Sequence, residues 1–144
     1  MMDMAELADS YLEAWSSTDP EAIVAWHTAD SIFHLHDILP PFVGREAIAD
    51  AARQFFHRSP DLRFDLVRFY FGKDHFVSEY VMCGTLRGRC FECEGVDVIF
   101  VRGGLVARKD TYIDWLTYQA QTGVNSLRRW DRLFESGKPP ARVS

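Results

Sequence analysis

The spacing of apolar residues changes from a helical to a strand-like period near Asp61, and this change constrains the fold more than any other feature of the chain. Before Asp61, apolar side chains recur every three or four residues, as along amphipathic helices. After it, four segments alternate in period two between glycine turns, at residues 62–71, 75–87, 90–102 and 105–115. Helices followed by a four-strand meander predict an α+β fold with a strongly curved antiparallel sheet.

Three helices are predicted in the first part of the chain. An apolar stripe defines the first, over about residues 3–17: Met4, Leu7, Ala8, Tyr11 and Trp15. Asp19-Pro20-Glu21 supplies an N-cap and a first-turn proline for the second, which carries Ile23 and Trp26. The third follows Gly44, and residues 31–37 form an extra strand before it. A further helix is expected in 116–135, interrupted at Gly123 and capped again at Asn125 or Ser126.

Length and charge limit the classes of function. The 144 residues fit one domain, expected over 1–137, with a flexible tail at 138–144. A net charge of −5 disfavours nucleic acid as a partner, because phosphate binding needs a concentrated basic face. No apolar run approaches a membrane span, and the acidic N-terminus does not resemble a secretory leader. Three cysteines argue against a disulfide framework, so we expect a cytoplasmic protein.

The run SIFHLHD, residues 31–37, places imidazoles and hydrocarbon on opposite alternations of a strand. His34 and His36 share one face, and Phe33 and Leu35 the other. Such a histidine pair could bind a metal, but no third ligand is apparent in the sequence. Histidine is also a common proton carrier, because its unperturbed pKa of about 6.5 lies near neutral pH.

Asp97 lies within the apolar strand GVDVIFV. A carboxylate there loses its water, and this loss must be compensated. Desolvation favours the protonated acid, whereas a nearby cation favours the ionised one. Asp97 is therefore either a functional acid in a cavity or a structural residue bonded to a hydroxyl or a backbone amide. Tyr11 is open to the same two interpretations, as a core residue or a catalytic one.

Three stretches resemble the superfamily of nuclear transport factor 2, ketosteroid isomerase, limonene epoxide hydrolase, scytalone dehydratase and SnoaL-like polyketide cyclases. They are YLEAWSSTDPEAIVAWHTAD, GREAI and GVDVIFVRGGLVARKDTYIDW, and the likeness covers about residues 4–118. It implies an NTF2-like cone, in which a bent sheet wraps around three helices and encloses a deep apolar pocket, with an additional C-terminal helix. It also implies a homodimer and no cofactor or metal.

The resemblance also assigns site residues. Tyr11 and Asp97 match the two hydrogen-bond donors of the isomerases, where an apolar site keeps the carboxylic acid neutral, as in the ketosteroid isomerase case that is often used to illustrate this effect. His36 stands where those enzymes keep their carboxylate base, and Asp37 follows it. The expected pocket wall consists of Trp15, Trp26, His34, Tyr80, Met82 and Ile99. Tyr80 and Met82 replace the arginine and aspartate of the epoxide hydrolases, which disfavours epoxide hydrolysis.

These assignments predict a cofactor-independent acid–base enzyme: an isomerase, cyclase or dehydratase. The expected partner is a small apolar cyclic carbonyl or hydroxyl compound, such as a steroid, polyketide or terpenoid. His36 or Asp37 would move a proton, and Tyr11 and Asp97 would stabilise the oxyanion. The alternative is a non-catalytic ligand-binding or dimerisation module of the same fold. Alternation alone does not decide whether Lys109, Asp110 and Asp114 face the pocket, and rim or interface charges are expected there.

Overall fold

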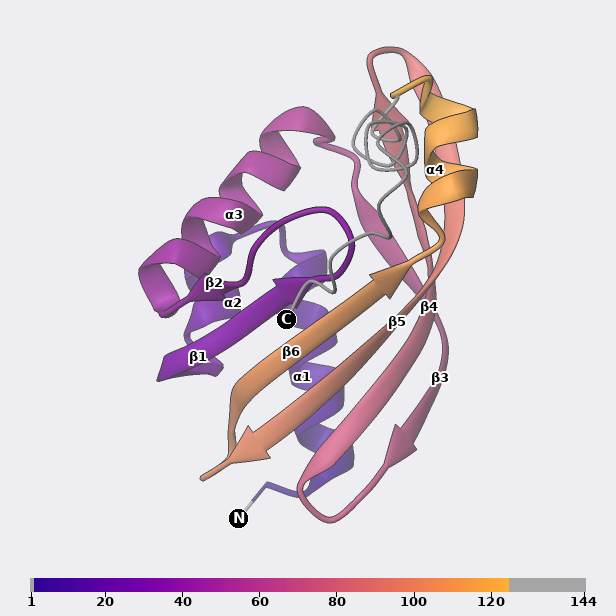
Figure 1. The fold of residues 1–144 in the computed structure, drawn as a ribbon. Helices are drawn as coiled ribbons and strands as arrows, with labels where there is room; N and C mark the ends of the chain where they lie inside the picture. The colour runs from indigo at the N-terminus through magenta and orange to yellow at the C-terminus, as the bar shows by residue number, and fades with distance from the viewer. Residues whose placement is uncertain (1, 125–144) are drawn as a thin grey trace, which may run out of the picture.

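A curved six-stranded sheet and four helices make up the computed structural model, which describes residues 2–124 (Figure 1). The helices are α1 (Met4–Ser16), α2 (Pro20–Val24), α3 (Arg45–Arg58) and α4 (Trp115–Thr122). The strands are β1 (His27–Leu35), β2 (Phe42–Val43), β3 (Arg63–Phe71), β4 (His75–Leu86), β5 (Arg89–Arg102) and β6 (Leu105–Ile113). The helix expected from Asn125 or Ser126, and the expected tail, lie outside the described residues.

The strands lie in the order β2-β1-β6-β5-β4-β3, which confirms the predicted meander of β3 to β6. Neighbours are antiparallel except β1 and β6, which run parallel and make the sheet mixed. The extra strand begins earlier than expected, at His27, and ends at Leu35, so His36 and Asp37 lie in the turn that follows. Between Phe100 and Val101 the β5–β6 pairing shifts by one residue, as in a β-bulge.

Local sequence explains where the helices begin. Asp3 caps α1, and its side chain and that of Glu6 form a reciprocal capping box. Asp19 caps α2 with Pro20 in the first turn, as predicted. Asp114 caps α4, and Gly123 ends it with a left-handed φ of 73°.

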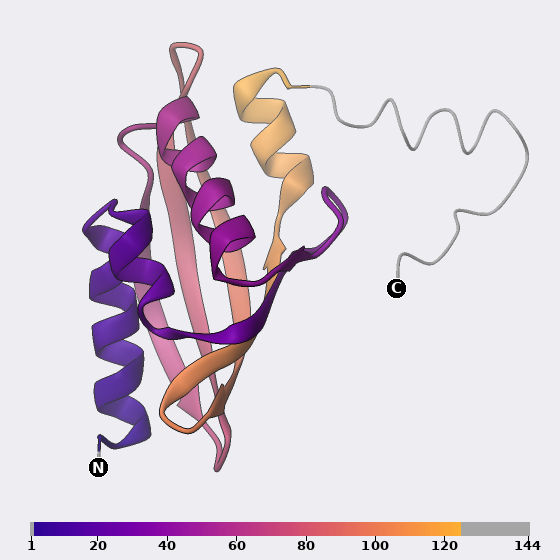
Figure 2. The same ribbon diagram turned by 90° about the vertical axis from the view of Figure 1, so that its left-hand side faces the viewer.

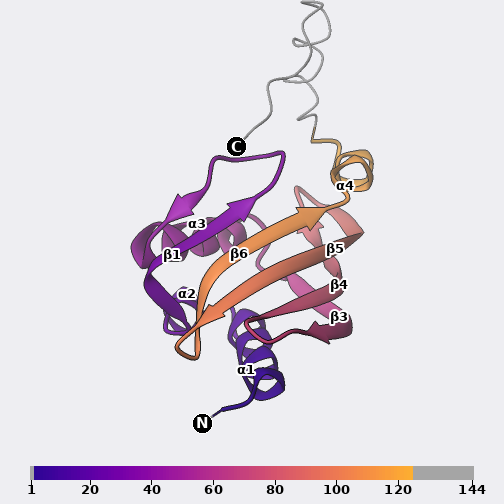
Figure 3. The same ribbon diagram turned by 60° about the horizontal axis from the view of Figure 1, so that its bottom comes forward.

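The three helices α1, α2 and α3 cover one face of the sheet, and the sheet curves around them (Figures 2 and 3). The most deeply buried side chains come from both layers and include Ile23, Ile48, Phe76, Ile99 and Val106. Helix α4 follows β6, contacts β5 and lies apart from α3, at the same end of the molecule (Figures 1 and 3). This arrangement is the expected α+β cone.

Candidate functional site

A cavity of about 630 Å³ lies between the helix-covered face of the sheet and helices α3 and α4. Most of its wall is apolar and includes Phe33, Leu35, Met82, Leu86, Phe91 and Ile113. Pockets of this volume, with an apolar wall and a few polar groups, are typical small-molecule sites. Two exposed arginines, Arg58 and Arg87, belong to the lining where it meets solvent.

The sheet contributes three buried polar side chains to this apolar wall: Tyr80 from β4, and Lys109 and Thr111 from β6. Lys109 and Thr111 are two residues apart, so they project from the same face of β6 as Ile113. The expectation that Lys109 is a rim or interface charge is therefore wrong. Residues that are paired on neighbouring strands project from the same face of the sheet. Asp97 pairs with Thr111 and Ile99 with Lys109, so Thr111 and Lys109 point inward together with Asp97.

Asp97 lies directly behind this part of the wall and accepts contacts from all three side chains. Tyr80 Oη donates to Asp97 Oδ1 at 2.8 Å, and Thr111 Oγ1 donates to the same atom at 2.6 Å. Lys109 Nζ lies 3.4 Å from Asp97 Oδ2. Three donors directed at one carboxyl group suit an ionised carboxylate in a buried ion pair, whereas the family resemblance implies a neutral acid that donates a hydrogen bond.

The Lys109 ammonium also lies against aromatic rings. Its Nζ atom is 3.8 Å from the centre of a Trp15 ring and 4.7 Å from that of Phe33, distances at which a cation is attracted to the ring face. Burial lowers the pKa of Lys109, and the Asp97 carboxylate opposes that change. Lys109 therefore places an ionisable amine in a water-poor environment beside the cavity.

Tyr11 is separated from Asp97's hydrogen-bond network and has a partner of its own. Its hydroxyl lies 2.7 Å from His27 Nε2, and His27 Nδ1 lies 2.8 Å from Ser31 Oγ. Burial raises the pKa of Tyr11 and lowers that of His27 to about 3, with Lys109 and Arg45 adding to the latter effect. Tyr11 and Asp97 do line one small void of about 20 Å³ next to the cavity, which shares Trp15, Tyr80 and Lys109 with it.

The expected base is not at the cavity. On β1 the apolar alternation, Phe33 and Leu35, faces the cavity, so His34 and His36 lie on the other face of the sheet. Asp37 is exposed in the turn after β1, where its φ is 71°. Within residues 2–124, neither His36 nor Asp37 faces Tyr11 and Asp97 across a cavity, which corrects the arrangement expected from the sequence.

The remaining predicted pocket residues divide into two groups. Trp15, Tyr80 and Met82 line the cavity. Ile99 is buried in the core, Trp26 is half-buried just after α2, and His34 belongs to the opposite face, so these three are not in its lining.

Solved structures of other proteins share this architecture at low sequence identity. A hypothetical protein with a ketosteroid isomerase-like fold from Catenulispora acidiphila DSM 44928, in complex with trimethylamine, superposes with a TM-score of 0.78 at 22% identity, covering 85% of this chain and 95% of that one. A candidate polyketide cyclase from Xanthomonas campestris pv. campestris gives 0.74 at 22% identity, covering 81% and 94%. An NTF2-like protein of unknown function from Burkholderia pseudomallei K96243 gives 0.78 at 14%, covering 86% and 100%.

These likenesses define an NTF2-like, ketosteroid isomerase-like fold. Residues 8–109 match the SnoaL-like domain, and the chain belongs to that family. No curated protein sequence matches the chain. None of the helices in residues 2–124 is long and apolar enough to cross a membrane.

Proposed function

We propose that the chain is a cofactor-independent acid–base enzyme that isomerises, cyclises or dehydrates a small apolar cyclic compound. The substrate would carry a carbonyl or hydroxyl group, as steroids, polyketides and terpenoids do. The observation that carries the proposal is the buried amine of Lys109, paired with Asp97, in the wall of a mainly apolar cavity. Strongly perturbed ionisable groups inside a cavity are characteristic of catalytic sites.

Lys109 is the proposed proton-transfer group. As an ammonium ion it can donate a hydrogen bond to a substrate oxygen and stabilise negative charge that develops there. Because burial lowers its pKa, it loses a proton more readily than an exposed lysine and can act in both directions. Asp97 would retain the ammonium form, and Tyr80 and Thr111 would hold the carboxylate in place.

This proposal moves proton transfer from the expected His36 to Lys109 and keeps Asp97 as its ionic partner. Tyr11 lines the small void beside the cavity, where its hydrogen bond to His27 orients it. A hydrogen-bond donor to the oxyanion, the role proposed for the Lys109 ammonium, commonly contributes about 3 kcal/mol to transition-state stabilisation. Loss of the Lys109 amine should therefore cost a factor of about a hundred or more in turnover.

The test begins with a thermal-shift screen of steroids, aromatic polyketides and terpenoids against the wild-type chain, followed by turnover assays on each compound that binds. Lys109→Met should lower turnover by a factor of about a hundred or more, and Tyr80→Phe should reduce it. Lys73→Met is the matched control, because Lys73 is an exposed lysine in the turn between β3 and β4. Wild-type turnover in Lys109→Met would refute the assigned role.

The second candidate is a non-catalytic ligand-binding module, which the internal pairing of the polar groups favours. Tyr80, Thr111 and Lys109 all satisfy Asp97 and need no ligand to do so. On this hypothesis a compound binds in the cavity and is released unchanged, with equal affinity for wild type and Tyr80→Phe. The screen separates the two functions by whether the bound compound is converted.

A homodimer formed through the outer face of the sheet remains a prediction from the family. Exposed apolar side chains on the strands, among them Val67, Phe100 and Tyr112, are the candidate contacts. Light scattering at micromolar concentration should then give about twice the chain mass of 16.6 kDa. A particle of the single-chain mass would argue against the dimer.

A further inference from the structure

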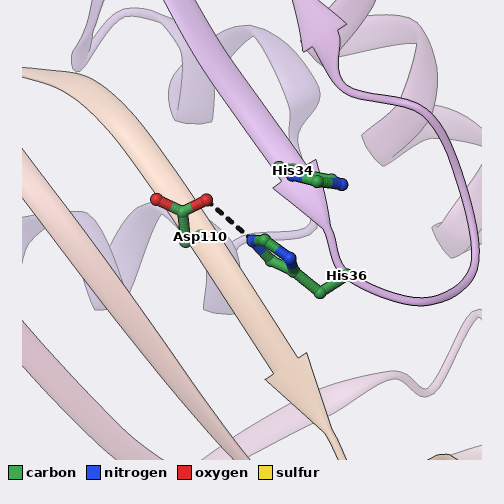
Figure 4. A group of neighbouring side chains, drawn as sticks. All are labelled: His34, His36 and Asp110. Carbon is green, nitrogen blue, oxygen red and sulfur yellow. Dashed lines mark hydrogen bonds and ion pairs between the residues drawn. The ribbon is translucent and has the colours of Figure 1, made fainter. Parts of the chain in front are cut away.

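A second group of ionisable side chains lies on the sheet face opposite the cavity: His34, His36 and Asp110 (Figure 4). His34 on β1 and Asp110 on β6 are paired neighbours in the parallel ladder. His36 lies in the turn directly after β1 and points back toward Asp110 (Figure 4). One nitrogen of each histidine and one carboxylate oxygen of Asp110 all lie within 4.8 Å of one another.

We propose that His34, His36 and Asp110 bind a divalent first-row transition-metal ion of the zinc class. Two imidazole nitrogens and one carboxylate oxygen are donors that Zn²⁺, Co²⁺ and Ni²⁺ accept, whereas Mg²⁺ and Ca²⁺ prefer sites made wholly of oxygen. The sequence showed the histidine pair without a third ligand. The parallel pairing of β1 with β6 supplies it from 74 residues further along the chain.

His34 also carries a buried ring nitrogen that has no partner in the described part of the chain. His34 is only 2% exposed, and its Nε2 atom has no hydrogen-bond partner among residues 2–124. A buried polar atom without a partner costs free energy, so such atoms in folded proteins call for an explanation.

The two imidazoles are already held side by side. The His34 and His36 ring centres are 3.8 Å apart, and the His36 ring stacks on Tyr112 at 4.2 Å. The backbone of His36 is fixed on both sides, because its N–H donates to the Thr111 carbonyl and its own carbonyl accepts from Trp115 Nε1, each at 3.0 Å. Such support positions ligands before an ion arrives.

Arg108 is the competitor for the same carboxylate. Its Nε donates to Asp110 Oδ2 at 2.8 Å and its Nη2 donates to Oδ1 at 3.0 Å, while His36 Nε2 lies 2.8 Å from Oδ1. An ion would replace the His36–Asp110 hydrogen bond and share Asp110 with Arg108. Bonds of about 2.0–2.1 Å hold tetrahedral ligand atoms closer together than 4.8 Å, so the His36 side chain would rotate toward the other two ligands while its backbone stays in place.

Titration of the untagged full chain with Co²⁺, followed by visible absorption, and with Zn²⁺, followed by calorimetry, tests this site. One ion per chain is expected, with no binding of Mg²⁺ at the same concentration. His34→Ala, His36→Ala and Asp110→Asn should each weaken binding by about tenfold or more. His75→Ala is the matched histidine control, because His75 lies outside the cluster and pairs with Asp74, with Nδ1 3.0 Å from Oδ1. Cys90→Ser controls for binding by the exposed thiol.

Arg108→Gln keeps the proposal testable even where a histidine variant fails to fold. Removing the guanidinium frees both Asp110 oxygens and removes a repelling charge, so Zn²⁺ should bind several-fold more tightly than to wild type. Absence of binding to wild type and Arg108→Gln at millimolar Zn²⁺ would overturn the site. So would an affinity that is lost in Cys90→Ser and unchanged in all of the cluster variants.

Discussion

Lys109 and Asp97 form an ion pair in the interior of the protein, with Nζ 3.4 Å from Oδ2 and side chains only 5% and 9% exposed. Bringing two charges out of water is costly, and their mutual attraction repays that cost only while both are present. The pair therefore ties stability to the same two groups that we propose for catalysis. Removing one partner leaves the other as an unpaired buried charge.

Replacing Asp97 by alanine should destabilise the fold by about 3–5 kcal/mol, because Lys109 loses its counter-ion and the Tyr80 and Thr111 hydroxyls lose their acceptor. Urea denaturation measures the change. Asp30→Ala is the matched control, since Asp30 forms an exposed ion pair with Arg102 and its loss should cost at most about 1 kcal/mol. An equal loss of unfolding free energy in Asp97→Ala and Asp30→Ala would show that the buried ion pair stabilises the fold no more than the exposed one.

Lys109→Ala should also be destabilised, and a small amine should restore part of the loss. The substitution leaves a space beside Asp97 and against the Trp15 ring, where ethylammonium can take the place of the missing side chain. The measurement is the melting temperature with and without ethylamine, at constant pH and ionic strength. An equal rise in Lys109→Ala, Lys73→Ala and wild type would exclude a specific rescue.

His27 should make the fold sensitive to mild acid. Its pKa is about 3 in the folded state, against about 6.5 in an unfolded chain, so between these values the unfolded state binds more protons. The free energy of unfolding should therefore fall as pH falls below about 6.5, by up to about 1.4 kcal/mol per pH unit, until about pH 3. Urea denaturation at several pH values measures this slope.

His27→Gln provides the comparison, because glutamine can still accept a hydrogen bond from Tyr11 but does not titrate. Its unfolding free energy should depend less steeply on pH over this range. His57→Gln, at an exposed position, is the control for the histidine-to-glutamine exchange itself. A His27→Gln slope as steep as that of wild type would assign the acid sensitivity to other groups.

Gly95→Ala should disturb the cavity wall. Gly95 pairs with Tyr80 across β4 and β5, and an added Cβ would lie 2.7 Å from Tyr80 Cε2 and 2.5 Å from Ile113 Cδ1. Both side chains line the cavity, so both would have to shift. We expect a loss of about 1–3 kcal/mol in the free energy of unfolding, with weaker ligand binding. Gly88→Ala is the comparison without a steric contact, because an added Cβ there meets nothing within 4 Å and its cost reports only the left-handed φ of 79°.

Much of the fold could be predicted from the sequence because its signals are local. The apolar stripe of α1 and the Asp19-Pro20 start of α2 depend on residues within one or two helical turns. The glycine turns likewise separate the strands of the meander. The short β2 strand carries too few residues for a periodic signal.

The site was harder to predict because alternation defines two faces of a strand without saying which is inside. On β1 the apolar pair, Phe33 and Leu35, faces the cavity, and the family comparison had favoured the histidines. On β6 the Gly103-Gly104 turn does not give the answer either. Next to the turn, Arg102 pairs with Leu105 and Val101 with Val106. The bulge then shifts the register by one residue, so that Phe100 pairs with Arg108.

The same bulge makes the length of this hairpin matter in a way that surface loops usually do not. Beyond it, β6 presents Lys109 to the cavity and Asp110 to the opposite face. Losing one residue between Phe100 and Leu105 would force the strand either to rebuild the bulge or to turn each side chain to the other side. In the second case the acid would enter the apolar cavity and the amine would face the two histidines. Insertions and deletions in this hairpin should therefore be selected against far more strongly than in the exposed turn at Gly88.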